Sequence, residues 1–181
     1  MLRGCAAITK QATLKRKDVK MATIIYCSNS GSAKRYAELL SEKTGSPCVD
    51  IKKMSAVNAD EEIIFITWIM AGALQGLKEV REAFGSIKAV CGVGMMKSEK
   101  AAEETKAKNA VTEPYFFLTG DFDINKLTGM YKMMMGMMLK MVKGKIKESG
   151  DEKGEEMLKL LENGIKGFDE KELDAVIEFL S

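Results

Sequence analysis

A short apolar run that leads through a polar turn into a helical pattern constrains the fold more than any other feature. Thr23 to Cys27 is β-branched and apolar, which is typical of a buried parallel strand. The turn Ser28-Asn29-Ser30-Gly31-Ser32 follows, and from Ala33 apolar residues recur at helical spacing as far as Gly45. The first N–H groups of a helix lack internal partners and lie at the positive end of its dipole. Residues 28–33 are therefore predicted to bind an anion such as phosphate, and a capped helix start without a ligand is the alternative.

Strand-like and helix-like segments alternate along the rest of the chain. The further predicted strands are residues 47–51, 63–67, 87–93 and 115–118, and the further predicted helices are residues 74–84, 98–109 and 169–180, the last with an Asp169–Glu172 capping box. This alternation predicts an α/β fold, a three-layer doubly wound sheet of five parallel strands in the order 2-1-3-4-5. Such sheets bind ligands beyond the carboxyl ends of their strands. Loops 28–33, 67–72 and 93–96 are therefore the candidate site.

Composition narrows the chemistry that such a site performs. The 181 residues include no histidine, which excludes histidine triads and histidine-ligated metals. The four cysteines are scattered along the chain, which favours reduced thiols. Chemistry that side chains cannot perform by themselves would therefore come from a cofactor, and no catalytic side chain or metal ligand is predicted. Residues 1–20 carry six basic residues and one acidic residue, whereas the rest carries 22 basic and 25 acidic residues. A mildly acidic body does not indicate a nucleic-acid binder.

Residues 1–20 are expected to stand apart from the domain formed by residues 21–181. The segment is basic and has no apolar run long enough for a secretory signal. We interpret it as a disordered extension or an upstream misread start, and we expect a cytoplasmic protein. Its oligomeric state is not indicated by the sequence.

The second candidate loop holds the single tryptophan of the chain, Trp68, between Thr67 and Ile69-Met70. A flat aromatic side chain at this place could stack on a flat cofactor ring. A tryptophan that meets no ligand is the alternative. Gly94 and Met95 of the third loop are predicted to flank the same ring.

Residues 124–161 change in character and are predicted to be a helical insertion. Half of the 14 methionines lie between Met130 and Met141, and four lysines of this segment fall within about 80° of one another on a helical wheel. The run is too short and too often interrupted by lysine to cross a bilayer. Three interpretations stay open: packing against the sheet, contact of residues 127–147 with a membrane surface, or a pliable surface for a flat hydrophobic ligand or protein partner.

The ordered set of motifs resembles one branch of the flavodoxin superfamily, which holds the menaquinone-dependent protoporphyrinogen dehydrogenases and related flavodoxin-domain proteins. Ser28 to Ala33 resembles the flavodoxin phosphate loop Ser/Thr-x-Ser/Thr-Gly-x-Thr, with Ala33 where the family usually has a hydroxyl. The other matching pieces are Thr67-Trp-Ile-Met-Ala-Gly72, Leu118-Thr-Gly-Asp-Phe-Asp123, the Tyr-Lys-Met-Met-Met run from Tyr131, and Phe168-Asp-Glu before the last helix.

The resemblance implies a flavodoxin-like fold and flavin mononucleotide (FMN) as cofactor. Contacts to FMN are implied for Ser28, Asn29, Ser30, Gly31, Ser32, Ala33, Thr67, Trp68, Ile69, Met70, Gly94 and Met95. It further implies an FMN-dependent oxidoreductase that oxidises a protoporphyrinogen-like substrate and passes electrons to quinone or a redox partner, in the cytoplasm or at the inner face of the membrane. The alternatives are a flavodoxin-type electron carrier without its own substrate and an interaction module without FMN, which Ala33 favours.

Overall fold

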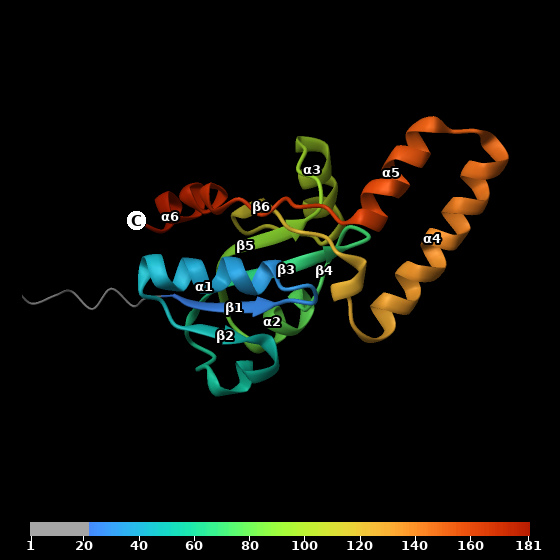
Figure 1. The fold of residues 1–181 in the computed structure, drawn as a ribbon. Helices are drawn as coiled ribbons and strands as arrows, with labels where there is room; N and C mark the ends of the chain where they lie inside the picture. The colour runs from blue at the N-terminus through green and yellow to red at the C-terminus, as the bar shows by residue number, and fades with distance from the viewer. Residues whose placement is uncertain (1–21) are drawn as a thin grey trace, which may run out of the picture.

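Five parallel strands form the centre of the molecule. The computed structural model describes residues 22–181, without the side chains of Lys153 and Met157, so the predicted extension at 1–20 lies outside the described residues. The parallel strands are β1 (Thr23–Cys27), β2 (Cys48–Asp50), β3 (Glu62–Met70), β5 (Ser86–Gly94) and β6 (Tyr115–Thr119). They lie in the order β2-β1-β3-β5-β6, which is the predicted order of the five parallel strands (Figure 1).

A sixth strand, β4 (Ala73–Leu74), pairs antiparallel with β3 and was not predicted. The structure also corrects the prediction that residues 68–72 are a loop and that a helix begins at Leu74. β3 continues to Met70 and turns back through Ala71 (φ 49) and Gly72 (φ 76), two consecutive positive φ angles that suit a two-residue hairpin. Alanine rarely adopts this conformation, so the sequence did not indicate the turn.

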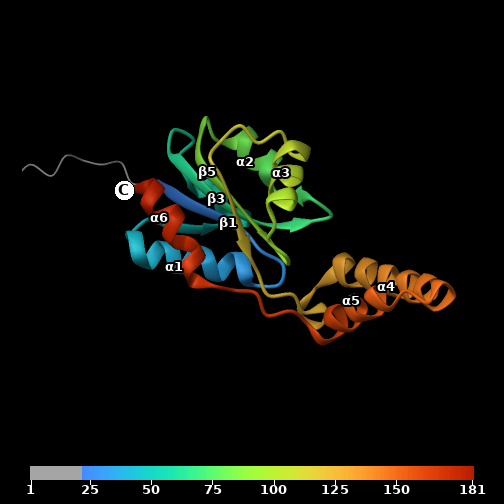
Figure 2. The same cartoon turned by 90° about the horizontal axis from the view of Figure 1, so that it is seen from above.

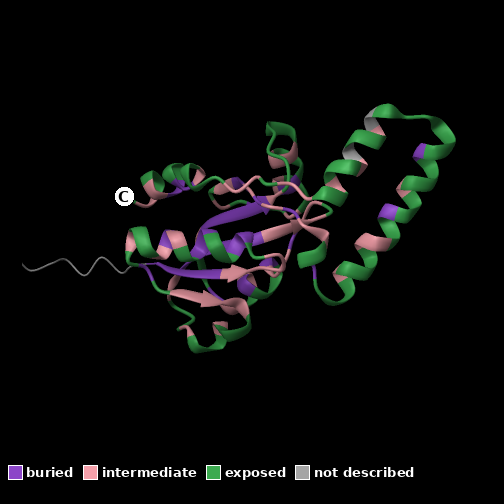
Figure 3. Cartoon of the chain, in the orientation of Figure 1, coloured by how far each residue is buried: buried purple, intermediate pink, exposed green. Residues whose placement is uncertain are grey.

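Helices cover both faces of the sheet. On one face lie α1 (Ser32–Thr44) and α6 (Asp174–Leu180), and on the other lie α2 (Leu77–Ala83) and α3 (Glu99–Lys108) (Figure 2). Neighbouring strand residues alternate between the two layers, so Ile24 packs beneath α1 whereas Ile25 packs with Val80 of α2. This confirms the three-layer arrangement, and Figure 3 shows the buried strands between the helices.

The segment that precedes the last helix, residues 169–173, makes different hydrogen bonds from those predicted. The predicted capping box of Asp169 and Glu172 is wrong, although Asp169 Oδ1 does cap the 3₁₀ helix η3 (Glu170–Leu173) by accepting from Lys171 N at 3.0 Å. The Glu172 carboxylate instead accepts hydrogen bonds from Thr119 N, Thr119 Oγ1 and Lys97 Nζ. The edge of β6 offers these donors, and they take the carboxylate away from the helix start. Two more 3₁₀ helices, η1 (Ile51–Ala56) and η2 (Ile124–Lys126), lie in the connections.

An arm of two antiparallel helices, α4 (Gly129–Ser149) and α5 (Glu152–Asn163), extends from the carboxyl edge of the sheet (Figure 1). At its base Phe122 and Ile165 exchange two backbone hydrogen bonds of 2.8 and 2.7 Å, and Lys143 of α4 forms an ion pair with Glu162 of α5. The interpretation of the methionine-rich helix as one packed flat on the sheet is therefore wrong. Across residues 22–181 no helix is long and apolar enough to span a bilayer.

Candidate functional site

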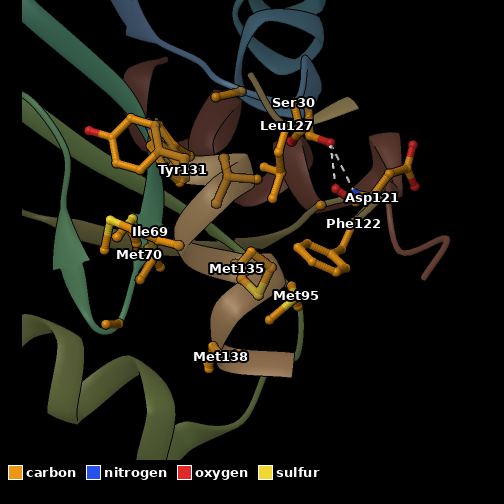
Figure 4. A pocket seen from close by; sticks show the side chains of 18 residues that line it. Ser30, Ile69, Met70, Met95, Asp121, Phe122, Leu127, Tyr131, Met135 and Met138 are labelled. Atoms are coloured by element: carbon orange, nitrogen blue, oxygen red, sulfur yellow. Dashed lines mark hydrogen bonds between the residues drawn. The ribbon is translucent and has the colours of Figure 1, made fainter. Parts of the chain in front are cut away.

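A cavity of about 500 Å³ lies where the arm meets the carboxyl ends of the strands. Its size is within the range typical of small-molecule sites. Its walls come from five places: Ser30, Ser32 and Ala33 at the start of α1, residues 68–71 from β3, residues 93–95 from β5, residues 120–122 after β6, and Leu127, Tyr131, Met134, Met135 and Met138 from the arm. Ser30 and Asp121 lie at one end and Met138 at the opposite end (Figure 4). The cavity thus has a polar end and a long apolar part.

The polar end is formed by the turn that leads into α1. Ser28 Oγ accepts a hydrogen bond from Gly31 N at 3.2 Å, and Arg35 N donates to Gly31 O at 3.0 Å, which closes the first helical turn. Gly31 has φ +106, and a Cβ at this position would meet no chain atom within 4 Å. Glycine is therefore required by the backbone conformation and not by crowding from the chain. The next N–H groups, those of residues 32–34, lack helical acceptors.

The serine hydroxyls of this turn have different tasks. Ser32 is 7% exposed, and its Oγ accepts from Asp121 N at 3.0 Å and donates to Asp121 O at 3.3 Å. Ser28 Oγ accepts the hydrogen bond from Gly31 N described above. Ser30 lines the cavity and a neighbouring polar hollow of about 180 Å³, and within residues 22–181 its hydroxyl has no hydrogen-bond partner. Ser30 is therefore the serine best placed to bond a ligand.

The polar hollow beside the cavity holds two cations and two carboxylates. Arg35 places its guanidinium 3.7 Å from the centroid of the Phe168 ring and 4.0 Å from Asp121 Oδ2. Asp121 Oδ1 accepts from the backbone N–H groups of Gly167 and Phe168 at 2.9 and 3.1 Å. Lys126 and Asp123 line the same hollow. Arg35 and Lys126 are therefore cationic donors beside the start of α1, and the carboxylates of Asp121 and Asp123 offset their charge.

The apolar part is walled by an aromatic pair and a pinned hairpin. Trp68 meets Tyr131 of α4 edge-on, with ring centroids 4.9 Å apart and an interplanar angle of 87°. Asn109 holds the β3–β4 hairpin, because its side chain accepts from Leu74 N at 2.9 Å and donates to Gly72 O at 2.8 Å. Lys108 Nζ donates to Ala71 O at 2.5 Å. The end of α3 thereby fixes the wall that carries Met70.

Eight of the twelve residues predicted for the site line this cavity: Ser30, Ser32, Ala33, Trp68, Ile69, Met70, Gly94 and Met95. Gly31 lines the polar hollow instead. Asn29 holds the loop against the arm, where its Oδ1 accepts from Thr128 N at 3.4 Å. Thr67 is fully buried, and its hydroxyl donates to Gln75 O. Ala33 is 1% exposed and also packs in the core beneath α1.

Sequence reasoning did not select the segment after β6, Gly120 to Phe122, or the arm residues as cavity walls. The signal for Gly120 to Phe122 was present, because this segment follows the fifth predicted strand and so must lie at the same edge as the other three loops. No comparable signal located the arm. Its wall depends on how residues 124–129 turn the chain back across the strand ends, which no local pattern shows.

Titratable side chains at the site do not supply an obvious nucleophile. Cys27, the last residue of β1, does not line the cavity, and burial raises the pKa of its thiol above the ordinary value. It is therefore a neutral thiol at physiological pH, which is weakly nucleophilic. Among residues 22–181 there is no cluster of three or more histidine, cysteine, aspartate or glutamate side chains that could hold a metal ion.

Comparison with known proteins finds little that is similar. Neither a protein-family model nor a curated protein matches the chain. Among solved structures, it is similar to the Trp repressor binding protein from Bacillus subtilis, at 12% identity and a TM-score of 0.37, over 55% of this chain and 84% of that chain. So distant a likeness carries no argument. The fold assignment rests on the parallel sheet itself, whose strand order is that of flavodoxin-like proteins.

Proposed function

We propose that this chain is an FMN-binding, flavodoxin-like protein that transfers electrons, either as an oxidoreductase or as a carrier. The observation that supports the proposal is the two-part cavity at the switch between β1 and β3. FMN carries a phosphate at one end and a flat, largely apolar ring system at the other. The polar turn before α1 and the long apolar part of the cavity match these two halves in chemistry and in order.

The residues present fit the phosphate. The N–H groups of the first turn of α1 and the Ser30 hydroxyl would donate to it, and Arg35 and Lys126 are charged donors in the adjoining hollow. The absence of a hydroxyl at Ala33 leaves one donor fewer than in the usual flavodoxin loop. The remaining donors are backbone groups, which do not depend on side-chain identity.

The apolar part fits a flat ring. Trp68, Met95 and Tyr131 line it from three different elements, and the hairpin pinned by Asn109 forms a further wall. A bound flavin would supply reversible one- and two-electron chemistry. The chain would orient the ring, exclude water from it, and tune its potential through stacking and backbone contacts.

Absorption spectroscopy tests the proposal directly. The purified protein should show flavin bands or acquire them on titration with FMN. Ser30→Asp places a carboxylate where the phosphate would lie, and it should weaken FMN binding by about 100-fold or more while affecting riboflavin, which lacks the phosphate, far less. Ser86→Asp, at an exposed site at the start of β5, is the matched control and should change neither affinity.

A colourless protein that binds neither FMN nor riboflavin would contradict the proposal. It would leave the interaction module without FMN as the surviving interpretation. Equal weakening of FMN and riboflavin by Ser30→Asp would instead contradict the placement of the phosphate at this turn, because a general disturbance of the loop affects both ligands alike.

The methionine wall favours an enzyme with a flat hydrophobic substrate over a simple carrier. Met134 and Met138 line the cavity and are each 41% exposed, so they continue from the cavity onto the open surface of α4. Thioether side chains adapt to flat apolar molecules, such as a porphyrinogen donor or a quinone acceptor. The finer proposal is therefore oxidation of a protoporphyrinogen-like substrate with a quinone as acceptor.

Assays of the FMN-loaded protein with protoporphyrinogen IX and a menaquinone analogue distinguish an oxidoreductase from an electron carrier. Porphyrin fluorescence and quinone reduction should appear together, and Met134→Gln with Met138→Gln should lower kcat/KM by about tenfold. Met96→Gln, an exposed methionine that does not line the cavity, is the control. Protein that binds FMN, accepts electrons from a reductase and oxidises no porphyrinogen would be a carrier.

A further inference from the structure

Four methionines of α4 form a continuous exposed stripe, defined here as Met130, Met133, Met137 and Met141. Their exposed fractions are 63, 62, 62 and 59%. At 100° per residue they fall within about 80° of one another, and the stripe is about 17 Å long. The two buried side chains of α4, Leu139 and Ile146, lie on the opposite side of the helix. The stripe is therefore an apolar surface that no described part of the chain covers.

The stripe is continuous with the cavity. Met134 and Met138 border it on one side and also line the cavity, as Figure 4 shows for Met138. Scattered exposed apolar residues are ordinary in proteins, whereas a contiguous patch of this kind marks an interaction surface. The exposed residues of α4 thus join the outer face of the arm to the site.

The charge of α4 contrasts with that of the rest of the molecule. This helix carries five lysines and one glutamate, a net charge of +4, whereas the remainder of residues 22–181 carries 17 basic and 24 acidic residues, a net charge of −7. An electropositive helix on an acidic body directs the arm toward an anionic partner.

The lysines lie on both sides of the methionine stripe. Lys140 and Lys147 fall within about 90° of its centre on one side, and Lys145 does so on the other. Lys132 lies further round, toward α5, as does Lys143, which is paired with Glu162. The one acidic residue of α4, Glu148, lies at the C-terminal end of the stripe. The acidic residues of α5 are Glu152, Glu155, Glu156 and Glu162.

We propose that α4 is a docking surface for a bilayer that contains anionic phospholipid. The methionine stripe would enter the boundary between headgroups and acyl chains, while Lys140, Lys145 and Lys147 would contact the phosphates. An apolar line with lysines on both sides is the pattern of a helix that lies in the membrane interface. Lysine is depleted at protein–protein interfaces, whereas lysines beside an apolar line suit anionic headgroups. The inference does not depend on FMN.

Vesicle flotation of the full-length chain tests the proposal. The protein should float with vesicles of phosphatidylcholine containing about one third phosphatidylglycerol and only weakly with pure phosphatidylcholine, and salt should release it. Replacement of the four stripe methionines by glutamine should weaken binding at least about tenfold. Replacement of the same four by leucine is the matched control and should keep binding, because leucine is equally apolar.

A second set of variants tests the charge. Lys140→Glu, Lys145→Glu and Lys147→Glu together should reduce binding to the anionic vesicles more than about tenfold. The same three-lysine reversal on the body, at the exposed Lys43, Lys52 and Lys53, should have a much smaller effect. A further variant, with Lys15, Arg16 and Lys17 changed to glutamine, measures the contribution of the basic residues before position 21.

Three results would overturn the proposal. The first is a glutamine variant that floats as well as the natural chain. The second is binding that vanishes on neutralising residues 15–17 but survives the changes in α4. The third is a chain that binds neither kind of vesicle. If that chain forms dimers in sedimentation measurements and the glutamine variant does not, the stripe is instead an interface with a second copy.

Discussion

The α/β body and the α4–α5 arm bury their apolar residues to very different degrees. In the body, Ile25, Phe65 and Ile66 have no exposed surface, whereas methionines of α4 are up to 63% exposed. Figure 3 shows the same contrast, with buried strands in the body and mostly exposed helices in the arm. The sheet is covered by helices on both faces, while each arm helix has one helical neighbour. The number of covering layers, more than local hydrophobicity, therefore decides what is buried.

This difference assigns the two regions different tasks. Buried apolar surface in the body stabilises the fold, and the arm leaves comparable surface accessible for a ligand, a membrane or a partner. The comparison predicts that equivalent substitutions have unequal effects in the two regions.

The largest contrast is expected for side-chain truncation. Phe65→Ala removes a fully buried ring from the core beneath α2 and should lower the free energy of unfolding by about 3–5 kcal/mol. Met137→Ala in the stripe should lower it by about 0.5 kcal/mol or less, because the side chain is mostly in water already. Urea titration of both variants measures the difference. Similar losses for the two would mean that the arm is as tightly covered as the body.

Removal of one hydroxyl tests how firmly the C-terminal segment is fastened to the body. Tyr36 Oη donates to Thr119 O at 2.7 Å and accepts from Asp169 N at 3.1 Å, and the side chain is fully buried. Tyr36→Phe leaves both groups unpaired and should cost about 1–3 kcal/mol. In the arm, Tyr131→Phe should cost less than about 0.5 kcal/mol, since the half-buried Tyr131 makes its contact to Trp68 through the ring. A loss under 0.5 kcal/mol for Tyr36→Phe would show that water replaces its partners.

The same glycine-to-alanine change should have effects of opposite sign on stability in the two regions. A Cβ at Gly92 in β5 would lie 2.5 Å from Tyr115 Oη and 2.9 Å from Leu74 Cδ2, so Gly92→Ala should destabilise by about 1–3 kcal/mol. A Cβ at Gly144 in α4 would meet nothing within 4 Å, so Gly144→Ala should stabilise that helix by up to about 1 kcal/mol. Thermal unfolding reports the first change, and hydrogen exchange of α4 amides reports the second. If the α4 amides of Gly144→Ala exchange no more slowly than those of the natural chain, an intact α4 in solution is contradicted.

The smallest effect is expected from an ion pair of the body. Burial alone would raise the pKa of Glu113, but hydrogen bonds and charge from Arg81, 2.7 Å away, lower the pKa below its ordinary value. A lowered pKa in the folded state means that the charged carboxylate stabilises the fold above the unfolded-state pKa and that this contribution is lost as the pH falls through the folded-state pKa.

Glu113→Gln should therefore destabilise at neutral pH by about 1 kcal/mol or less, because the pair is partly exposed. The difference between natural and variant chains should shrink in acid, as measured by unfolding at several pH values. Lys143→Gln in the arm, which breaks the more exposed pair with Glu162, is the counterpart and should have still less effect. A difference for Glu113→Gln that is constant with pH would contradict the charge-based explanation.

Local patterns were sufficient for most of the body. Apolar runs located each parallel strand to within a few residues, and Gly45, which has φ 74, ends α1 as expected. Ser98, the first residue of the predicted helix 98–109, caps α3, since its Oγ accepts from Ala101 N at 3.1 Å. The β3–β4 hairpin was missed because its turn begins with Ala71, a residue without a turn preference.

The candidate site could be located only in part. The parallel-sheet rule brought together residues from the three selected loops, and eight of the predicted twelve line the cavity. Tyr131 and Met135 could not be placed there, since their contact with the strand ends depends on the path between β6 and α4. Thr67 was selected by its position in a loop, yet the extended β3 buries it.

The sequence by itself determined the alternating elements, the absence of histidine chemistry, and the polar turn before α1, because these depend on residue identity and on spacing along the chain. Only the tertiary structure decided that the methionine-rich helix leaves the sheet, pairs with α5 and closes one side of a cavity. An amphipathic pattern states that a helix has an apolar face, and the long-range packing of the chain decides what that face meets.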